Sequence, residues 1–326
     1  MQEEEFARMA HRLLIIMLIC IIVLVGSVLT HVTISMHQTI SAEPASRMLW
    51  SPPDTLSIPE GEEGTLIRYG RALINHTSVY LGPRGKIAAM SNGLNCTNCH
   101  LDGGTRPFAA NYSAVASTYP KYRDRSGTIE DIEKRINDCF ERSLNGLRLD
   151  TFSREMKAMV AYFKWLGRDV PRGIRPLGAG LVTLDYLDRA ADPEAGKQHY
   201  LSNCARCHGA DGQGIMNVEG NEWIYPPLWG ERSYNTGAGL FRLSKFAAFI
   251  KMNMPFGVTH RDPLLTDEEA WDIAAFVNSM PRPHKDFPSD WPDLRRKPID
   301  HPFGPYADTF STDQHKYGPY LEISRQ

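Results

Sequence analysis

The pattern Cys-x-x-Cys-His occurs twice in this chain, at residues 96–100 and 204–208. Two thiols at this spacing can form thioether bonds to the vinyl groups of a haem, and the histidine that follows can bind the iron from one face. A zinc site would need a second ligand pair nearby, and a redox dithiol does not require the histidine. The sequence therefore predicts two covalently bound c-type haems. Their attachment residues would be Cys96, Cys99, Cys204 and Cys207, with His100 and His208 as axial ligands.

The other cysteines do not provide a disulfide framework. The chain has six cysteines, and the two motifs use four of them. Cys20 lies in an apolar run, so only Cys139 needs a separate explanation. The composition is that of a folded protein, since 42% of the residues are hydrophobic and 23% are charged, and the net charge of -2 argues against a nucleic-acid partner.

An uncharged apolar stretch near the N-terminus runs from Leu13 to Thr30. As a helix it would be about 27 Å long, which nearly matches the hydrocarbon core of a bilayer. Arg8 and Arg12 precede it and place the N-terminus in the cytoplasm. We expect a single-pass anchor in a bacterial cytoplasmic membrane, with the haem domains in the periplasm. The alternative is a cleaved signal peptide and a soluble periplasmic protein, although such peptides have a shorter apolar core of about 7–15 residues.

The fold is expected to be mainly α, with two cytochrome c-like haem domains after the N-terminal transmembrane helix. Apolar periodicity and capping residues predict helices at about 153–166, from 192, at 243–252 and at 266–280, and a further helix that opens near Ser126 and Thr128. The predicted parts are an anchor at 1–42, a linker at 43–60, a first haem domain with the active site at 61–175, a second haem domain resembling class I cytochrome c at 176–285, and a wrapping tail at 286–326.

The second iron needs a sixth ligand, and the best candidate in the sequence is Met254, which precedes a proline in the loop after the predicted helix 243–252. A thioether ligand raises the potential of a haem and suits electron transfer. Lys251 and Met252 lie in the same segment and remain alternatives.

For the first iron no comparable Met-Pro loop follows, and Cys139 is the candidate instead. A lone thiol is usually a buried structural residue, but the sequence around this one is polar. Arg135, Cys139 and Ser143 are spaced four residues apart, which places them on one face of a helix, with Arg142 near the same side. Guanidinium groups beside a thiol favour the thiolate and can bind an anionic substrate.

Four segments together resemble the thiosulfate dehydrogenases of the TsdA type, dihaem c-type cytochromes that join two thiosulfates into tetrathionate. They are residues 95–100, 135–146, 204–208 and 253–255. The segment 135–146 is the specific one, because haem motifs alone occur in many cytochromes. The resemblance covers nearly the whole body of the chain, from about residue 64 to the tail.

This resemblance implies an oxidoreductase in which His100 and Cys139 ligate an active-site haem, while His208 and Met254 ligate the haem from which electrons leave. It also implies a substrate pocket lined by Arg125, Arg135 and Ser143, with Cys139 catalytic. The partners would be thiosulfate or tetrathionate and a periplasmic acceptor such as a small cytochrome c, and the reaction could also run as tetrathionate reduction. Two features depart from the family: some relatives have a lysine ligand near the methionine, where this chain has Asn253, and the anchor is unlike the soluble members.

Another class of function stays open from the residues alone. The chain could be a non-catalytic dihaem carrier between a membrane quinol-oxidising enzyme and a periplasmic acceptor, in which case the arginines around Cys139 would have no task. A dihaem peroxidase would need an open iron face with a carboxylate or amide for peroxide, and the sequence offers no such arrangement.

Overall fold

The computed structural model describes residues 11, 14–29 and 49–325. The chain divides into a first unit of residues 1–48 and a second unit of residues 49–326. In the first unit the described residues 14–29 are helical, and their large apolar side chains are exposed. Among the described helices none has the length and apolar character needed to cross a bilayer. The structure therefore does not support the predicted transmembrane helix, whose end residues Leu13 and Thr30 lie outside the described part.

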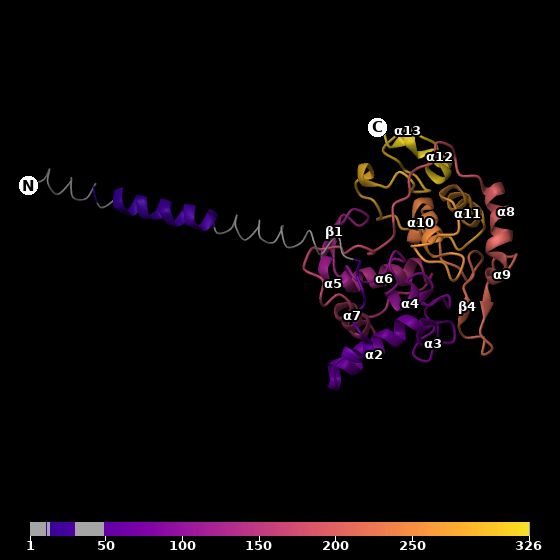
Figure 1. The fold of residues 1–326 in the computed structure, drawn as a ribbon, viewed down its shortest axis with the longest axis horizontal. Helices are drawn as coiled ribbons and strands as arrows, with labels where there is room; N and C mark the ends of the chain where they lie inside the picture. Colours follow the sequence, from indigo (N-terminus) through magenta and orange to yellow (C-terminus); the bar gives the residue numbers. More distant parts are fainter. Residues whose placement is uncertain (1–10, 12–13, 30–48, 326) are drawn as a thin grey trace, which may run out of the picture. The chain divides into compact units, whose positions relative to one another are not determined.

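The first haem motif lies in a mainly helical half of the second unit, drawn from indigo to magenta in Figure 1. Its elements are α2 (Gly61–Asn75), α3 (Thr77–Leu81), α4 (Leu101–Gly104), α5 (Val115–Thr118), β1 (Lys121–Arg123), β2 (Thr128–Glu130), α6 (Ile132–Arg142) and α7 (Arg154–Leu166). The two long helices α2 and α7 pack closely at Gly70, which has no side chain to separate them. A Cβ at this position would lie 2.0 Å from the carbonyl oxygen of Ala158. Ser153 caps α7 by accepting a hydrogen bond from the Met156 amide.

The second haem motif is carried by a second helical half, drawn mainly in orange. It contains α8 (Pro193–Asn203), α9 (Ala205–His208), β3 (Ile215–Met216), β4 (Trp223–Tyr225), α10 (Leu243–Asn253) and α11 (Asp267–Ser279). Here too a glycine allows the close helix contact, since a Cβ on Gly196 of α8 would lie 1.9 Å from the Asp272 carbonyl oxygen in α11. The predicted helices at 153–166, from 192, at 243–252 and at 266–280 correspond to α7, α8, α10 and α11.

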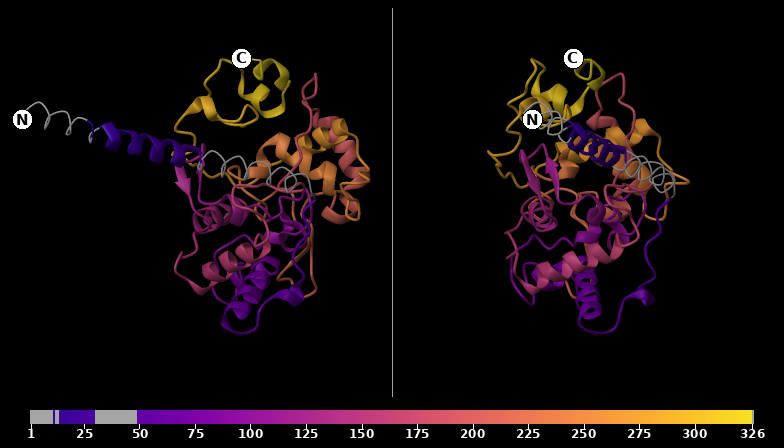
Figure 2. Two further views of the ribbon diagram at one scale, coloured as in Figure 1. Left: turned by 60° about the vertical axis from the view of Figure 1, so that its left-hand side comes forward. Right: turned by 90° about the vertical axis from the view of Figure 1, so that its left-hand side faces the viewer.

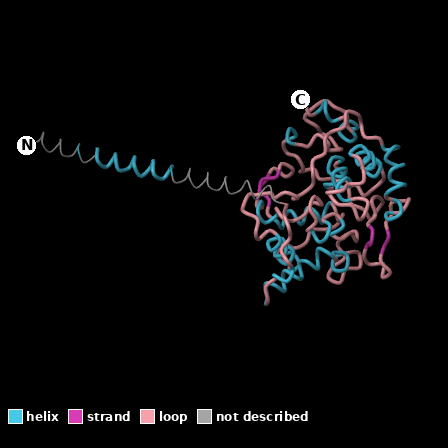
Figure 3. Tube along the Cα trace, viewed as in Figure 1, coloured by secondary structure: helices cyan, strands magenta, loops and turns pink. Residues whose placement is uncertain are grey.

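Strands are few in the described part of the chain, as Figure 3 shows. The pairs β1–β2 and β3–β4 are antiparallel, and Tyr122 lies opposite Ile129 in the first of them. Short 3-10 helices occur at Thr55–Ser57, Cys96–Asn98, Gly239–Phe241 and Leu294–Arg296.

The prediction of a helix that opens near Ser126 and Thr128 is wrong in its starting point. Residues 128–130 form β2, and α6 begins only at Ile132. The side chain of Asp131 accepts a hydrogen bond from the Lys134 amide at 2.7 Å and so caps α6. Asp131 therefore marks the start of this helix, about one turn later than expected.

The C-terminal segment packs against both halves, and the views in Figure 2 show its helices α12 (Thr312–Tyr317) and α13 (Tyr320–Ile323) beside the second one. Tyr320 and Ile323 belong to the hydrophobic core of the second half. Asp290 instead reaches the first half, where it accepts two hydrogen bonds from Arg142 at 2.8 and 2.7 Å. The boundaries of the predicted parts stay a prediction.

Candidate functional site

A cavity of about 220 Å³ in the first half brings the first haem motif together with Cys139. Cys96, Cys99, His100 and Cys139 all line it, together with apolar side chains from α2, α5, α6 and α7. The imidazole Nδ1 of His100 donates a hydrogen bond to the Ala110 carbonyl oxygen at 2.5 Å, which leaves Nε2 for a metal. A covalently bound haem requires a thiol pair for attachment, an oriented imidazole as iron ligand and an apolar wall around the porphyrin, and this cavity provides all three.

Cys139 lies on α6 at this cavity, and its thiol is electrostatically perturbed. Burial raises its pKa, but the Arg135 guanidinium and a hydrogen bond with His100 outweigh burial and lower the pKa to about 7. Arg135 donates to the Cys139 sulfur at 3.1 Å. His100 and Cys139 line the same cavity, so both would be available to an iron held there.

Of the three residues predicted to line the substrate pocket, two line the cavity beside Cys139 and one does not. Arg135 and Ser143 line the cavity beside Cys139. Arg125 does not line it; its Nε lies 3.9 Å from an Asp290 oxygen, and its guanidinium lies over the Trp291 ring at 5.6 Å. Burial and the neighbouring Arg142 lower the pKa of Arg125 to about 10. The structure thus groups Arg135 and Ser143 with Cys139, whereas Arg125 lies against the tail.

Sequence reasoning missed three further cations in the lining of this cavity: Lys121, Arg123 and Arg175. Lys121 and Arg123 are two residues apart on β1, so their side chains share one face of the strand. A strand of three residues is too short for its alternation to be recognised in the sequence. Nothing in the sequence near Arg175 connects it to the haem motif.

A second cavity of about 440 Å³ is lined by Cys204, Cys207, His208 and Met254. The Nδ1 of His208 donates to the Pro226 carbonyl oxygen at 2.8 Å, so this imidazole is oriented in the same way as His100. Lys251 and Met252 do not line the cavity. The Lys251 ammonium donates to the Leu265 carbonyl at 2.6 Å and lies 2.9 Å from an Asp267 oxygen. These contacts favour Met254 among the three candidates.

We expect the Met254→His variant to lower the midpoint potential of the second haem. A thioether is a weak donor that favours the ferrous state, whereas imidazole stabilises the ferric state. A spectroelectrochemical redox titration of the haem-loaded protein measures the change. Met252→Ala is the matched control and should leave both potentials in place. An unchanged potential in Met254→His together with a shift in Met252→Ala would reassign the ligand.

The two cavities lie next to each other, since Leu94, Asn95 and Cys99 line both. Trp223 of β4 also lines the second cavity while it packs against the core of the first half. Two haems held by adjoining cavities are placed for electron exchange.

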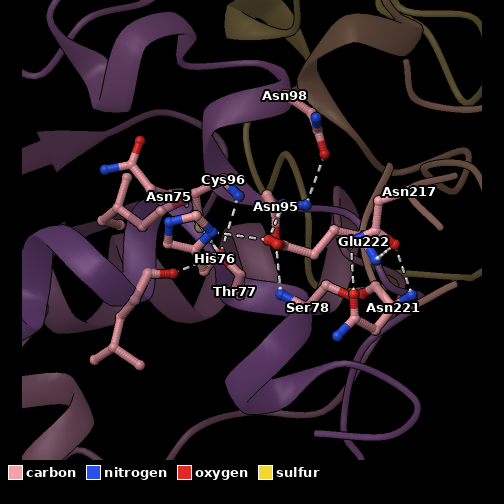
Figure 4. A network of polar contacts seen from close by, with 12 residues as sticks. Asn75, His76, Thr77, Ser78, Asn95, Cys96, Asn98, Asn217, Asn221 and Glu222 are labelled. Carbon is pink, nitrogen blue, oxygen red and sulfur yellow. Dashed lines mark hydrogen bonds and ion pairs between the residues drawn. The ribbon is translucent and has the colours of Figure 1, made fainter. Parts of the chain in front are cut away.

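A polar network joins the β3–β4 hairpin to the first haem motif, as Figure 4 shows. One carboxylate oxygen of Glu222 accepts from Nδ1 of His76 at 3.0 Å and from the Asn95 amide at 3.1 Å. Asn95 in turn accepts from the Ser78 backbone amide at 2.7 Å, and it directly precedes Cys96. The second half of the molecule therefore helps to fix the start of the first haem motif.

Comparison with known proteins agrees with this arrangement. Residues 86–171 match the family model described as SoxA/TsdA, cytochrome c domain, and residues 193–281 match the model described as cytochrome c. The two matches confirm the prediction of two c-type haems.

Two similar proteins are thiosulfate dehydrogenases. The chain is 42% identical over 257 residues to the thiosulfate dehydrogenase of Psychrobacter arcticus, covering 78% of this chain and 74% of the relative. It is also 42% identical to the thiosulfate dehydrogenase of Allochromatium vinosum, covering 74% of this chain and 87% of that protein.

A solved structure of the thiosulfate dehydrogenase TsdBA from Marichromatium purpuratum superimposes with a TM-score of 0.66 at 37% identity. The match covers 73% of this chain and 50% of that one, so this chain corresponds to half of the solved protein. With two haem cavities of the required chemistry and relatives at this level of identity, the chain belongs to the thiosulfate dehydrogenase family of TsdA-type dihaem c-type cytochromes.

Proposed function

We propose that this protein oxidises two thiosulfate ions to tetrathionate and passes two electrons to an external acceptor such as a small periplasmic cytochrome c. The observation that carries the proposal is the contact of 3.1 Å between Arg135 and Cys139 at a cavity that also holds a haem-attachment motif. An electron carrier alone has no use for a thiol with this partner. The family membership supports the same reaction.

The charges at the cavity suit the substrate. Thiosulfate is a dianion, and two unit charges at about 4 Å and an effective dielectric of about 20 repel each other by about 4 kcal/mol. Arg135 can offset this repulsion, and its own charge is secured because Cys139 raises its pKa. Ser143 lines the same cavity and can donate a hydrogen bond to a sulfonate oxygen.

We assign the covalent step to Cys139. Its thiolate and the terminal sulfur of one thiosulfate would form an S–S bond with the loss of two electrons, and two bound haems would supply the one-electron acceptors that this step needs. The terminal sulfur of a second thiosulfate then attacks the sulfane sulfur that is bonded to Cys139. That attack forms the central S–S bond of tetrathionate and releases the Cys139 thiolate, so the thiol is regenerated without further redox change.

A steady-state assay of the haem-loaded protein in both directions tests the proposal. We expect thiosulfate-dependent reduction of ferricyanide with tetrathionate as the product. Reduced viologen with tetrathionate measures the reverse reaction and so decides which direction is preferred. A protein that exchanges electrons with cytochrome c but turns over neither sulfur compound would be the non-catalytic carrier considered above.

We further propose that residues 13–30 anchor the protein in the cytoplasmic membrane, with the haem domains in the periplasm. The uncharged sequence and the exposed apolar side chains of the helical residues 14–29 support this proposal. Fractionation of cells that express the full chain tests it. Haem protein in the membrane pellet at the full mass of the chain is expected, whereas a shortened protein in the periplasmic extract would indicate signal cleavage.

A further inference from the structure

Three cations of the first haem cavity are not used by the proposed reaction: Lys121, Arg123 and Arg175. No aspartate or glutamate from the described residues lines this cavity. Within the same part of the chain, neither Lys121 nor Arg175 forms an ion pair, and Arg123 has a distant one, with Glu130 at 3.9 Å. Burial and the three guanidinium groups of Arg123, Arg175 and Arg135 lower the pKa of Lys121 to about 8. The cavity therefore carries positive charge that the protein itself does not balance.

These cations extend from one side of the haem-binding space to the other. A Cβ on Gly180 would lie 2.9 Å from Arg175, and Gly180 accepts a hydrogen bond from the Ala110 amide at 2.9 Å. Ala110 is the residue whose carbonyl orients His100, so Arg175 lies on the His100 side. Arg135 marks the opposite side, that of Cys139. Lys121 and Arg123 line the cavity from β1, and Lys121 is close enough to Arg135 and Arg175 for their charges to lower its pKa.

This placement follows the rim of a haem rather than one of its faces. The two axial ligands of an iron lie on opposite faces, so a row of cations that reaches both sides must pass along the edge. Cys96 contacts Thr77 of α3 at 3.3 Å, and α3 and β1 lie at opposite ends of this half (Figures 1 and 2). The thioether edge is therefore at one end and the cations of β1 are at the other, where a c-type haem carries its two propionate groups.

We propose that Lys121, Arg123 and Arg175 bind the propionate carboxylates of the first haem. A substrate at Cys139 would contact Arg135 but could not reach Arg175, which lies on the His100 side. The second cavity lacks such a set. Among its described lining residues Arg106 is the sole lysine or arginine, and both of its contacts, at 2.9 and 3.2 Å, are to Asp102. Only the first cavity thus has several lining cations without a close carboxylate partner among the described residues, and they would raise the potential that a thiolate ligand lowers.

The test is a redox titration of the haem-loaded Arg175→Gln and Lys121→Met variants. Removing a positive charge beside the first haem favours its ferric state, so its midpoint potential should shift downward in both variants. The second haem, identified through the Met254→His variant, serves as an internal control and should not shift. Lys164→Met, an exposed change on α7, should move neither potential.

The KM for thiosulfate separates this proposal from a substrate site. We expect a KM close to that of the unmodified protein in Arg175→Gln. A first-haem potential that stays in place while this KM rises would overturn the proposal and assign the cations to the substrate. A variant with both quantities unchanged would overturn it as well. Because the potential is measured without thiosulfate, the result does not depend on the proposed reaction.

Discussion

The Cys139→Ala protein should keep both haems and lose thiosulfate oxidation by on the order of a thousandfold or more. The haems are attached through the paired cysteines of the two motifs, so the change removes no thioether. It does remove the sulfur to which Arg135 donates at 3.1 Å and with it the group that would carry the first thiosulfate. Steady-state rates with ferricyanide, normalised to haem content, measure the loss.

Cys20→Ser is the matched control, because Cys20 is also a free cysteine but lies in the N-terminal unit. It should retain the full rate. A Cys139→Ala protein with undiminished turnover would remove Cys139 from the chemistry. If its turnover were intact and only the potential of the first haem changed, Cys139 would be an iron ligand and nothing more.

The part of the site that lies on one helix could be predicted from the sequence. Arg135, Cys139 and Ser143 follow the helical repeat, and the structure places all three in the lining of one cavity. The helices α8 and α11 could also be predicted from the sequence, because local capping signals mark where they begin. These signals are Asp192 with Pro193 for α8, and Thr266 with Glu269 for α11. Such features depend only on residues within a turn or two of each other.

The rest of the site depends on contacts between distant segments. Arg125 was expected at the substrate, yet its carboxylate neighbour is Asp290 in the tail, and no local pattern connects the two. Lys121 and Arg123 lie on a strand of three residues, which is too short to show a reliable period. Arg175 belongs to a segment that is held at the cavity by a distant contact, because the Gly180 carbonyl accepts a hydrogen bond from the Ala110 amide.

The hairpin β3–β4 is the clearest case of structure that the sequence did not show. Glu222 lies far along the chain from His76 and Asn95, and it bonds both of them beside the first haem motif. The same hairpin places Trp223 at the second cavity and against the first core. In the proposed reaction electrons would pass between the haems, so an element that contacts both cavities would affect turnover.

Replacing Arg135 with leucine should raise the KM for thiosulfate by about ten- to a hundredfold, since a hydrogen bond to a charged group contributes about 1.5–3 kcal/mol. The guanidinium lies against the Cys139 thiol in a cavity that no carboxylate of the described residues lines, so its loss removes the cation that contacts the reacting thiol. Arg135→Lys should recover only part of the affinity, because an ammonium keeps the charge but not the paired donors. Arg148→Leu is the control: its guanidinium is exposed and pairs with Glu141 at 3.3 Å outside the cavity. Unchanged KM and kcat in Arg135→Leu would exclude Arg135 from substrate binding.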